Sequence, residues 1–482
     1  MQAQLTLAAI FADHMVLQRK HTIVIWGQAL TGETVDVSLI KGGRDCCACA
    51  TQANQSGEWR VSLPAQDAGG PYKLRINQAD HSILLNDIMI GDVWLASGQS
   101  NMEWKLSWQV DNGQQDIAQS DNPHIRFFEV GKHYAAQSQT MISGSGWQIA
   151  SPATSGQFSA VAWHFAKRYQ QQTGIAVAII DSTWGGTPAE AWTSLETLQH
   201  IPGYQESALD MLKNAQQWQD RFKQIGGLHT QQASSEQEAQ SYKWKPGVCF
   251  NAMINPLIHF PIGGVLWYQG ENNVAAHALY TELFKGLIND WRARWQAPEL
   301  PFLFVQLASY LKQQAQPRNS DWALLREAQA SALSLPNTAM AVTIDLGDAQ
   351  DIHPRNKAPV GERLCHAARH LVLNQNVPYC GPVLTHLRAK NIQGKNVLEV
   401  AYQHIDGGLT IKGNTLLGFA IAGADGKFVN AQAQLEGDKV IVSSTKVKQP
   451  LSLRYAWADN SPANLYNKAG LPAVPFRCTV GQ

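Results

Sequence analysis

The chain has 482 residues, well above the roughly 100 to 200 of a typical single domain, so two to four domains with sizeable cores are expected. Its 38 basic and 38 acidic residues balance, which removes the electrostatic footprint of a nucleic-acid or anionic-membrane binder. We therefore expect a neutral ligand. The 16 Trp should be mostly core, with some faces able to stack on uncharged hydroxylated molecules such as sugars.

The chain contains three successive regions that differ in the pattern of their apolar residues. Residues 1–87 hold short alternating apolar runs separated by Gly, Pro and Asn turns, which predicts an N-terminal β-sandwich-like domain. Residues 88–380 alternate buried-type strands (176–180, 265–268, 302–305, 339–344) with helical stretches such as 280–295, which predicts a parallel α/β sheet covered on both faces. Residues 381–482 return to short alternating runs and predict a C-terminal β-rich domain.

A polar, Gln-rich segment interrupts the middle region at about 204–248. It contains a helix-like run from Gln217 to Gln224 and a looser stretch at 231–235. We expect a helical insertion on the surface, with a lid or a substrate wall as the alternative use.

The first candidate for chemistry is Ser100, which follows the apolar run 92–97 in the sequence Gly98-Gln99-Ser100-Asn101-Met102. In an α/β sheet the reactive groups lie at the carboxyl ends of strands, and a Gly permits the sharp turn there. The motif alone is a weak signal, so the argument for a nucleophile depends on partners elsewhere in the chain.

Three more polar loops close apolar strands. Gly185 and Gly186 precede a predicted helix with Pro188 near its first turn, which suits an anion-stabilising loop. The second loop is 269–273, where Asn273 can donate its side-chain N–H to the same oxyanion. The third loop, 345–357, holds His353 among carboxylates, as a general base and its orienting acid require. Together the four loops predict one catalytic site along a single edge of one sheet.

These motifs, in this order, resemble the sialate O-acetylesterase-type carbohydrate esterases of the SGNH hydrolase superfamily. The resemblance covers most of the chain. It rests on five longer strings as well: 11–19, 250–257, 454–460, 464–467 and 470–477. It implies a flavodoxin-like three-layer α/β/α fold of the SGNH type, flanked by the two β-rich domains.

The resemblance also implies removal of O-acetyl groups from sugars through an acetyl-enzyme. Ser100 would be the nucleophile and His353 the base, while Ser100, Gly186 and Asn273 would hold the oxyanion. The candidates for substrate binding are Gln99, Asn101, Gln269, Glu271 and Arg355. No cofactor or metal is implied.

The orienting acid departs from the pattern of many SGNH enzymes, which place it three residues before the His. That position is Gln350, so we favour Asp351 and keep Asp345, Asp348 and a weakly oriented Ser-His dyad as alternatives.

Two other functions compete with the esterase. A lipase or peptidase of the α/β-hydrolase type needs Gly-x-Ser-x-Gly, but Met102 occupies the position of the second Gly. A carbohydrate-binding protein with a vestigial catalytic region would fit the flanking β-domains and the Trp content, yet every expected catalytic residue type is present.

The seven Cys are an odd number and do not indicate a disulfide framework. Cys46, Cys47 and Cys49 cluster in a strand-like run, and His366 and His370 lie four apart on a predicted helix without a third ligand. We therefore predict no metal site.

No segment approaches the ~18 consecutive apolar residues of a membrane span. The first residues lack a basic region and a long apolar run. The expected location is periplasmic or secreted if a leader was removed, and cytoplasmic otherwise.

The sugar itself is left open between two classes. A sialic acid carboxylate favours an Arg clamp, and Arg355 is the one Arg in the four loops. A plant cell-wall oligosaccharide remains equally compatible, and the sequence does not indicate an oligomeric state.

Overall fold

The computed structural model describes residues 5–226 and 241–481 as a mixed α/β protein. The chain forms two compact units. The first comprises Met1–Trp267 and Lys285–Phe302, and the second comprises Tyr268–Phe284 and Leu303–Gln482. Each unit is described by itself below.

The first unit begins with the alternating strands that the sequence predicts. A three-stranded sheet has the order β1 (Thr6–Leu7), β3 (Ile23–Gln28) and β6 (Glu58–Leu63). In a second group, β4 (Thr34–Lys41) lies antiparallel between β5 (Arg44–Gln52) and β7 (Gly69–Gln78). Alternate residues of β3 and β6 are buried because successive side chains of a strand point to opposite faces.

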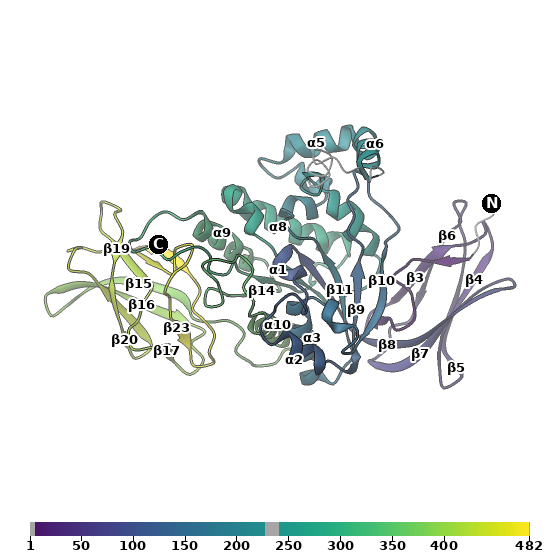
Figure 1. Cartoon of the computed structure of the whole chain (residues 1–482), viewed down its shortest axis with the longest axis horizontal. Coiled ribbons are helices and arrows are strands. Elements are labelled where there is room, and N and C mark those ends of the chain that lie inside the picture. The colour runs from purple at the N-terminus through teal and green to yellow at the C-terminus, as the bar shows by residue number, and fades with distance from the viewer. Residues whose placement is uncertain (1–4, 227–240, 482) are drawn as a thin grey trace. The chain divides into compact units, whose positions relative to one another are not determined.

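The strand β8 (His81–Gly98) belongs to two sheets at once (Figure 1). Its first half pairs antiparallel with β7, and its second half pairs parallel with β11 (Val177–Thr183). Within the first half Asp87 has a φ of 55°, and its carboxylate binds the buried Arg126 at 3.1 Å. The short β2 (Val16–Gln18) also pairs with β8 in parallel. The boundary predicted at 87/88 lies within this continuous strand, and the three predicted domains stay a prediction.

The central strands of the first unit have the order β10 (Gly144–Ala150), β9 (Asn122–Val130), β11, β8 and β12 (Gly264–Tyr268). β9, β11 and β8 are parallel, as the sequence predicts. β10 is antiparallel to β9, so the expectation of a wholly parallel sheet is wrong at this edge. The connection between β9 and β10 contains no helix, and an antiparallel pair needs no helical crossover.

Aromatic side chains bury both faces of these strands. Trp94 of β8 is fully buried against Phe165 and Tyr169 of α3 (Ala160–Thr173). Trp267 of β12 contacts Trp192 and Trp291 edge to face. These Trp side chains form core, as the sequence indicates for most of the 16.

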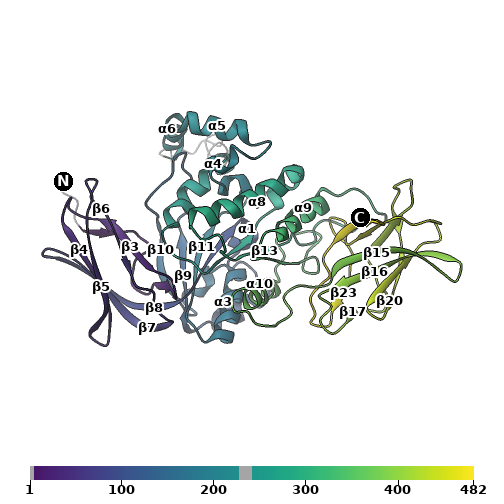
Figure 2. The same cartoon turned by 180° about the vertical axis from the view of Figure 1, so that it is seen from behind.

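The insertion contains α5 (Gln205–Lys213) and α6 (Ala215–Gly226), which pack in succession after α4 (Leu195–Leu198), as Figure 2 shows. The predicted helix from Gln217 to Gln224 lies within α6. The predicted loose stretch at 231–235 lies outside the described residues. Phe222 of α6 is buried and contacts Tyr134 edge to face, so this helix packs against another segment of the first unit.

In the second unit, β13 (Phe302–Val305) neighbours β14 (Thr338–Ala341), which ends three residues earlier than the predicted strand. The helices α9 (Asp321–Ala330) and α10 (Ala358–Leu371) belong to this unit, and α8 (His277–Arg294) has residues in both. α10 carries His366 and His370. His366 Nδ1 is 3.1 Å from a backbone oxygen, and His370 stacks on Tyr379.

The remaining strands of the second unit form three antiparallel groups. The four-stranded group is β15 (Val383–Ile392), β16 (Lys395–Gln403), β21 (Lys439–Ser443) and β20 (Gln432–Glu436). A pair joins β17 (Leu409–Ile411) to β23 (Leu465–Asn467), and the third group is β19 (Val429–Asn430), β18 (Phe419–Ala422), β22 (Ser452–Tyr455) and β24 (Phe476–Thr479). Phe419 and Tyr455 are buried cross-strand partners in the third group, and their rings are in contact.

All seven Cys are free thiols, and β5 carries the three that cluster. Within the described ranges no helix is long and apolar enough to cross a membrane. In the same ranges no group of three or more His, Cys, Asp and Glu residues is arranged to hold a metal ion.

The parallel contact of β8 with β11 requires a glycine at its start. A Cβ atom on Gly91 would lie 2.1 Å from the backbone oxygen of Ala176, whereas one on Gly69 would meet nothing closer than 3.6 Å. We predict that Gly91→Ala lowers the free energy of unfolding by about 1–3 kcal/mol, the usual cost of overpacking.

Gly69→Ala, also in a strand, is the matched control and should change the unfolding free energy by less than about 1 kcal/mol. Urea denaturation of both variants checks this. Equal stability of the two variants would contradict the close approach of β8.

Candidate active site

Ser100 lies in the turn that ends β8. Gly98 has a φ of 125°, a conformation that L side chains rarely adopt, and Ser100 then opens the short helix α1 (Ser100–Glu103). The backbone N–H of Trp184 donates to the Gly98 carbonyl at 3.0 Å, which ties this turn to the loop after β11. Ser100 itself is half-buried, while Asn101 and Met102 are buried.

The glycine loop after β11 lies against Ser100. Thr183, the last residue of β11, is in register with Gly98, so the two loops leave neighbouring parallel strands at the same end. A Cβ atom on Gly185 would lie 3.3 Å from the Ser100 Cβ, and Gly186 has a φ of 72°. The structure thus brings together the first two motifs of the sequence.

The helix expected after this loop is a four-residue 3-10 helix, Ala189–Trp192, with Pro188 at its N-cap. Instead of a long helix, side-chain hydrogen bonds hold the loop. Thr187 donates to the Trp184 carbonyl at 2.7 Å and accepts from the indole N–H of Trp192 at 2.8 Å.

A charged cluster of Glu103, Lys132 and Lys243 also holds the loop. The sequence alone does not predict this cluster. The buried Glu103 carboxylate accepts the backbone N–H of Gly185 and binds the Lys132 ammonium. Lys243 donates to the Gly185 carbonyl at 2.9 Å, and burial lowers the pKa of this lysine. The available signal was the position of Glu103, three residues after Ser100 on the same short helix.

In the second unit, Asn273 is held by a chain of amides. Gln269 donates to the Asn273 side-chain oxygen at 2.7 Å, and the Tyr280 hydroxyl donates to the Gln269 side-chain oxygen at 2.8 Å. Gln329 donates to the Gln269 backbone carbonyl at 3.0 Å. The Asn273 oxygen accepts this hydrogen bond, and its N–H₂ group is the donor end of the side chain.

His353 and Asp351 lie together in the loop after β14. The His353 Nδ1 is 3.4 Å from Asp351 Oδ1, which also accepts the His353 backbone N–H at 2.9 Å. Burial and the nearby Lys357 lower the pKa of His353, while Asp351 opposes the shift. Burial lowers the pKa of Lys357 itself to about 7, although Glu271 and Asp351 favour its charged form.

The alternative carboxylates have other partners. Asp345 makes two hydrogen bonds of 2.7 Å to the guanidinium of Arg363. Asp348 accepts the backbone N–H groups of Gln350 and Asp351. These contacts stabilise the loop that carries His353.

The candidates for substrate binding differ in accessibility. Gln99, Asn101 and Gln269 are buried, Glu271 is half-buried, and Arg355 lies 3.7 Å from Asp351 with 43% of its side chain exposed. Their contacts with a substrate stay predictions.

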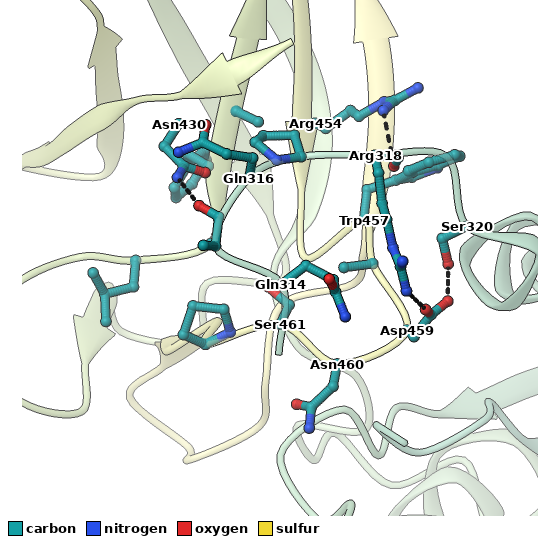
Figure 3. A pocket seen from close by; sticks show the side chains of 18 of the residues that line it. Gln314, Gln316, Arg318, Ser320, Asn430, Arg454, Trp457, Asp459, Asn460 and Ser461 are labelled. Carbon is teal, nitrogen blue, oxygen red and sulfur yellow. Dashed lines mark hydrogen bonds and ion pairs between the residues drawn. The ribbon is translucent and has the colours of Figure 1, made fainter. Parts of the chain in front are cut away.

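A pocket of about 320 Å³ in the second unit contains none of these residues (Figure 3). At one side of it, Asp459 binds Arg318 at 3.1 Å and Ser320 at 2.5 Å. The Asp459 backbone oxygen accepts the N–H of Tyr310, which bridges to Asp348 in the His353 loop. Tyr310 therefore links Asp459 in the pocket wall to the loop that carries His353.

Three comparisons relate the chain to known proteins. The family model described as carbohydrate esterase, sialic acid-specific acetylesterase, matches residues 243–370. The sialate O-acetylesterase of Mus musculus is 30% identical over 423 residues, covering 78% of this chain and 75% of that protein. The sialate O-acetylesterase of Homo sapiens is 30% identical over 409 residues, covering 78% and 73%.

A solved structure agrees over almost the full length. The carbohydrate acetylesterase from Xanthomonas citri is 36% identical, with a TM-score of 0.85 that covers 98% of this chain and 99% of that one. The chain belongs to the sialate O-acetylesterase family of carbohydrate esterases.

Proposed function

We propose that this protein is a carbohydrate O-acetylesterase, a carboxylic ester hydrolase that removes O-acetyl groups from sugars through an acetyl-enzyme. The observation that carries the proposal is the position of Ser100, at the carboxyl end of β8 and against the glycine loop. A serine in this place can attack an acyl carbon while neighbouring N–H groups receive the charge that develops on oxygen.

Ser100 Oγ attacks the acetyl carbonyl, and its proton passes to His353 Nε2, since Nδ1 faces Asp351. The N–H groups of Ser100 and Gly186 and the amide of Asn273 stabilise the oxyanion. The sugar oxygen leaves with the proton from His353, and water then releases acetate by the same steps in reverse order.

Asp351 is the orienting acid in this proposal. It is the carboxylate beside the His353 ring, whereas Asp345 is engaged by Arg363 and Asp348 by backbone N–H groups. Its charge favours the imidazolium that forms when His353 takes the proton.

The finer features of the fold belong to the same proposal. We assign residues 88–380 to an SGNH-type three-layer domain, flanked by β-rich domains at 1–87 and 381–482. Alternating strands at both ends and parallel β9, β11 and β8 in the middle support this assignment.

The substrate is an acetylated sugar. The relatives named as sialate O-acetylesterases support sialic acid, and the Xanthomonas citri carbohydrate acetylesterase supports a broader class that includes cell-wall oligosaccharides. Measuring acetate release from acetylated xylan and from O-acetylated sialic acid separates these two classes. Release from acetylated xylan would place the enzyme in polysaccharide degradation.

Ser100→Ala should reduce the hydrolysis of 4-nitrophenyl acetate by at least about 10³-fold, because the variant has no nucleophile at this position. Steady-state assays of the purified variant test this, with circular dichroism to verify folding. Undiminished turnover would contradict the assignment. An inactive wild-type protein would favour the vestigial binding protein instead.

The pH dependence of kcat/KM should report His353. A base must be neutral to accept a proton, and the lowered pKa of His353 makes it neutral at a lower pH than an ordinary histidine. We therefore predict that activity rises with pH, with a midpoint below the ~6.5 of an unperturbed histidine.

Asp351→Asn removes the charge that raises the His353 pKa. It should shift this midpoint to still lower pH and reduce kcat by up to about 10⁴-fold. Asp345→Asn is the comparison. It should lower thermal stability, because Asn keeps only one of the two oxygens that accept from Arg363 and loses the charge, while the midpoint stays in place. The opposite pattern would make Asp345 the orienting acid.

Glu103 should act as a positioning residue through the Gly185 N–H. Glu103→Ala leaves this N–H and Lys132 without their carboxylate partner, so the loop that presents Gly186 loses its anchor. We predict a fall in kcat of about tenfold or more with little change in KM, a fraction of the 10²–10³ that one oxyanion donor contributes.

Glu103→Gln is the matched control, because its amide oxygen can still accept the Gly185 N–H. It should recover most of the kcat that Glu103→Ala loses. Equal losses in the two variants would show that the carboxylate acts through its charge rather than by holding the loop.

A further inference from the structure

Two of the 16 Trp side chains are exposed, Trp108 at 40% and Trp244 at 48%. A single exposed aromatic residue is ordinary on a protein surface. Trp244 differs because its indole N–H donates to the Gly186 carbonyl at 2.7 Å. One edge of the ring is therefore fixed on the glycine loop while about half of the side chain faces solvent.

This anchor joins Trp244 to the loop that lies against Ser100. The Gly186 carbonyl belongs to the residue after Gly185, whose added Cβ atom would lie 3.3 Å from the Ser100 Cβ. Ser100, Gly185, Gly186 and Trp244 all lie in the first unit. The exposed Trp244 side chain is thus hydrogen-bonded to the residue that follows Gly185, and Gly185 lies against the proposed nucleophile.

The orientation of Trp244 is held by its neighbour as well. Lys243 donates to the Gly185 carbonyl at 2.9 Å. The consecutive side chains of Lys243 and Trp244 thus donate hydrogen bonds to the consecutive carbonyls of the loop. The Lys243 ammonium also lies 5.7 Å from the ring centre of Trp184, which stacks on Tyr134. Such anchoring restricts the rotamers of Trp244 before a ligand arrives, which lowers the entropic cost of binding.

The chemistry of the exposed face points to one kind of ligand. The indole N–H is already satisfied by Gly186, so the ring offers a ligand its π-face rather than a hydrogen bond. That face carries partial negative charge and attracts weakly positive C–H groups. A pyranose ring presents several C–H groups on one side while its hydroxyl groups stay available to water or to polar side chains.

We infer that Trp244 is a stacking platform for the pyranose ring that carries the scissile acetyl group, or for the ring next to it. This inference rests on the proposed esterase function. The platform holds the sugar beside Ser100, so it contributes to the affinity for sugar acetates and adds little to the attack on a small acetyl ester that has no sugar ring.

The test compares kcat/KM for glucose pentaacetate with kcat/KM for 4-nitrophenyl acetate in the same preparation. The ratio of the two cancels any fraction of misfolded protein. Trp244→Ala should lower the ratio by about tenfold, chiefly through a higher KM for the sugar acetate. Trp244→Phe keeps an aromatic face and should recover most of the ratio.

Leu84→Ala is the control, because Leu84 is 46% exposed and lies in the half of β8 that pairs with β7. It should leave the ratio unchanged. An unchanged ratio in Trp244→Ala, or a Phe variant as poor as the Ala variant, would overturn the stacking role. Failure of the wild-type protein to hydrolyse either ester would instead overturn the proposed function.

Discussion

The parallel pairing of β8 with β11 is the constraint on which the proposed site depends. The register sets Thr183 opposite Gly98, so the turn with Ser100 and the loop with Gly185 leave the sheet side by side. The absence of a side chain at Gly91 lets β8 approach the start of β11 closely. The position of Ser100 is thus set by sheet geometry, and the proposed chemistry then needs only short loops.

Charged and hydrogen-bonding side chains fix the glycine loop that follows β11. Glu103 is buried, and a buried carboxylate is costly unless it is paired. Lys132 and the Gly185 N–H satisfy it, and Lys243 binds the opposite side of the same glycine. The glycine loop is therefore fixed before substrate arrives, which is the preorganisation that an oxyanion site requires. In the second unit, the Gln269–Asn273 amide chain and the Asp351–His353 contact provide comparable order.

Much of this arrangement could be predicted from the sequence because each candidate loop follows an apolar strand. The turn at Ser100, the glycine loop, the amide loop and the His353 loop were all found in that way. Glu103, Lys243 and Trp244 were not, because their partners lie 58 to 82 residues away in the chain and depend on tertiary contacts. The antiparallel β10 and the short 3-10 helix after Pro188 also escaped prediction, since apolar runs carry no sign of strand direction or helix length.

The central claim, that Ser100 is the nucleophile, is tested most directly by covalent labelling. A phosphate triester such as 4-nitrophenyl diethyl phosphate reacts with an activated serine, which displaces 4-nitrophenolate and keeps the diethylphosphoryl group. Peptide mass spectrometry should find one such group per molecule on Ser100, in proportion to the activity lost. Complete inactivation with Ser100 unmodified, or labelling of another residue in its place, would contradict the account.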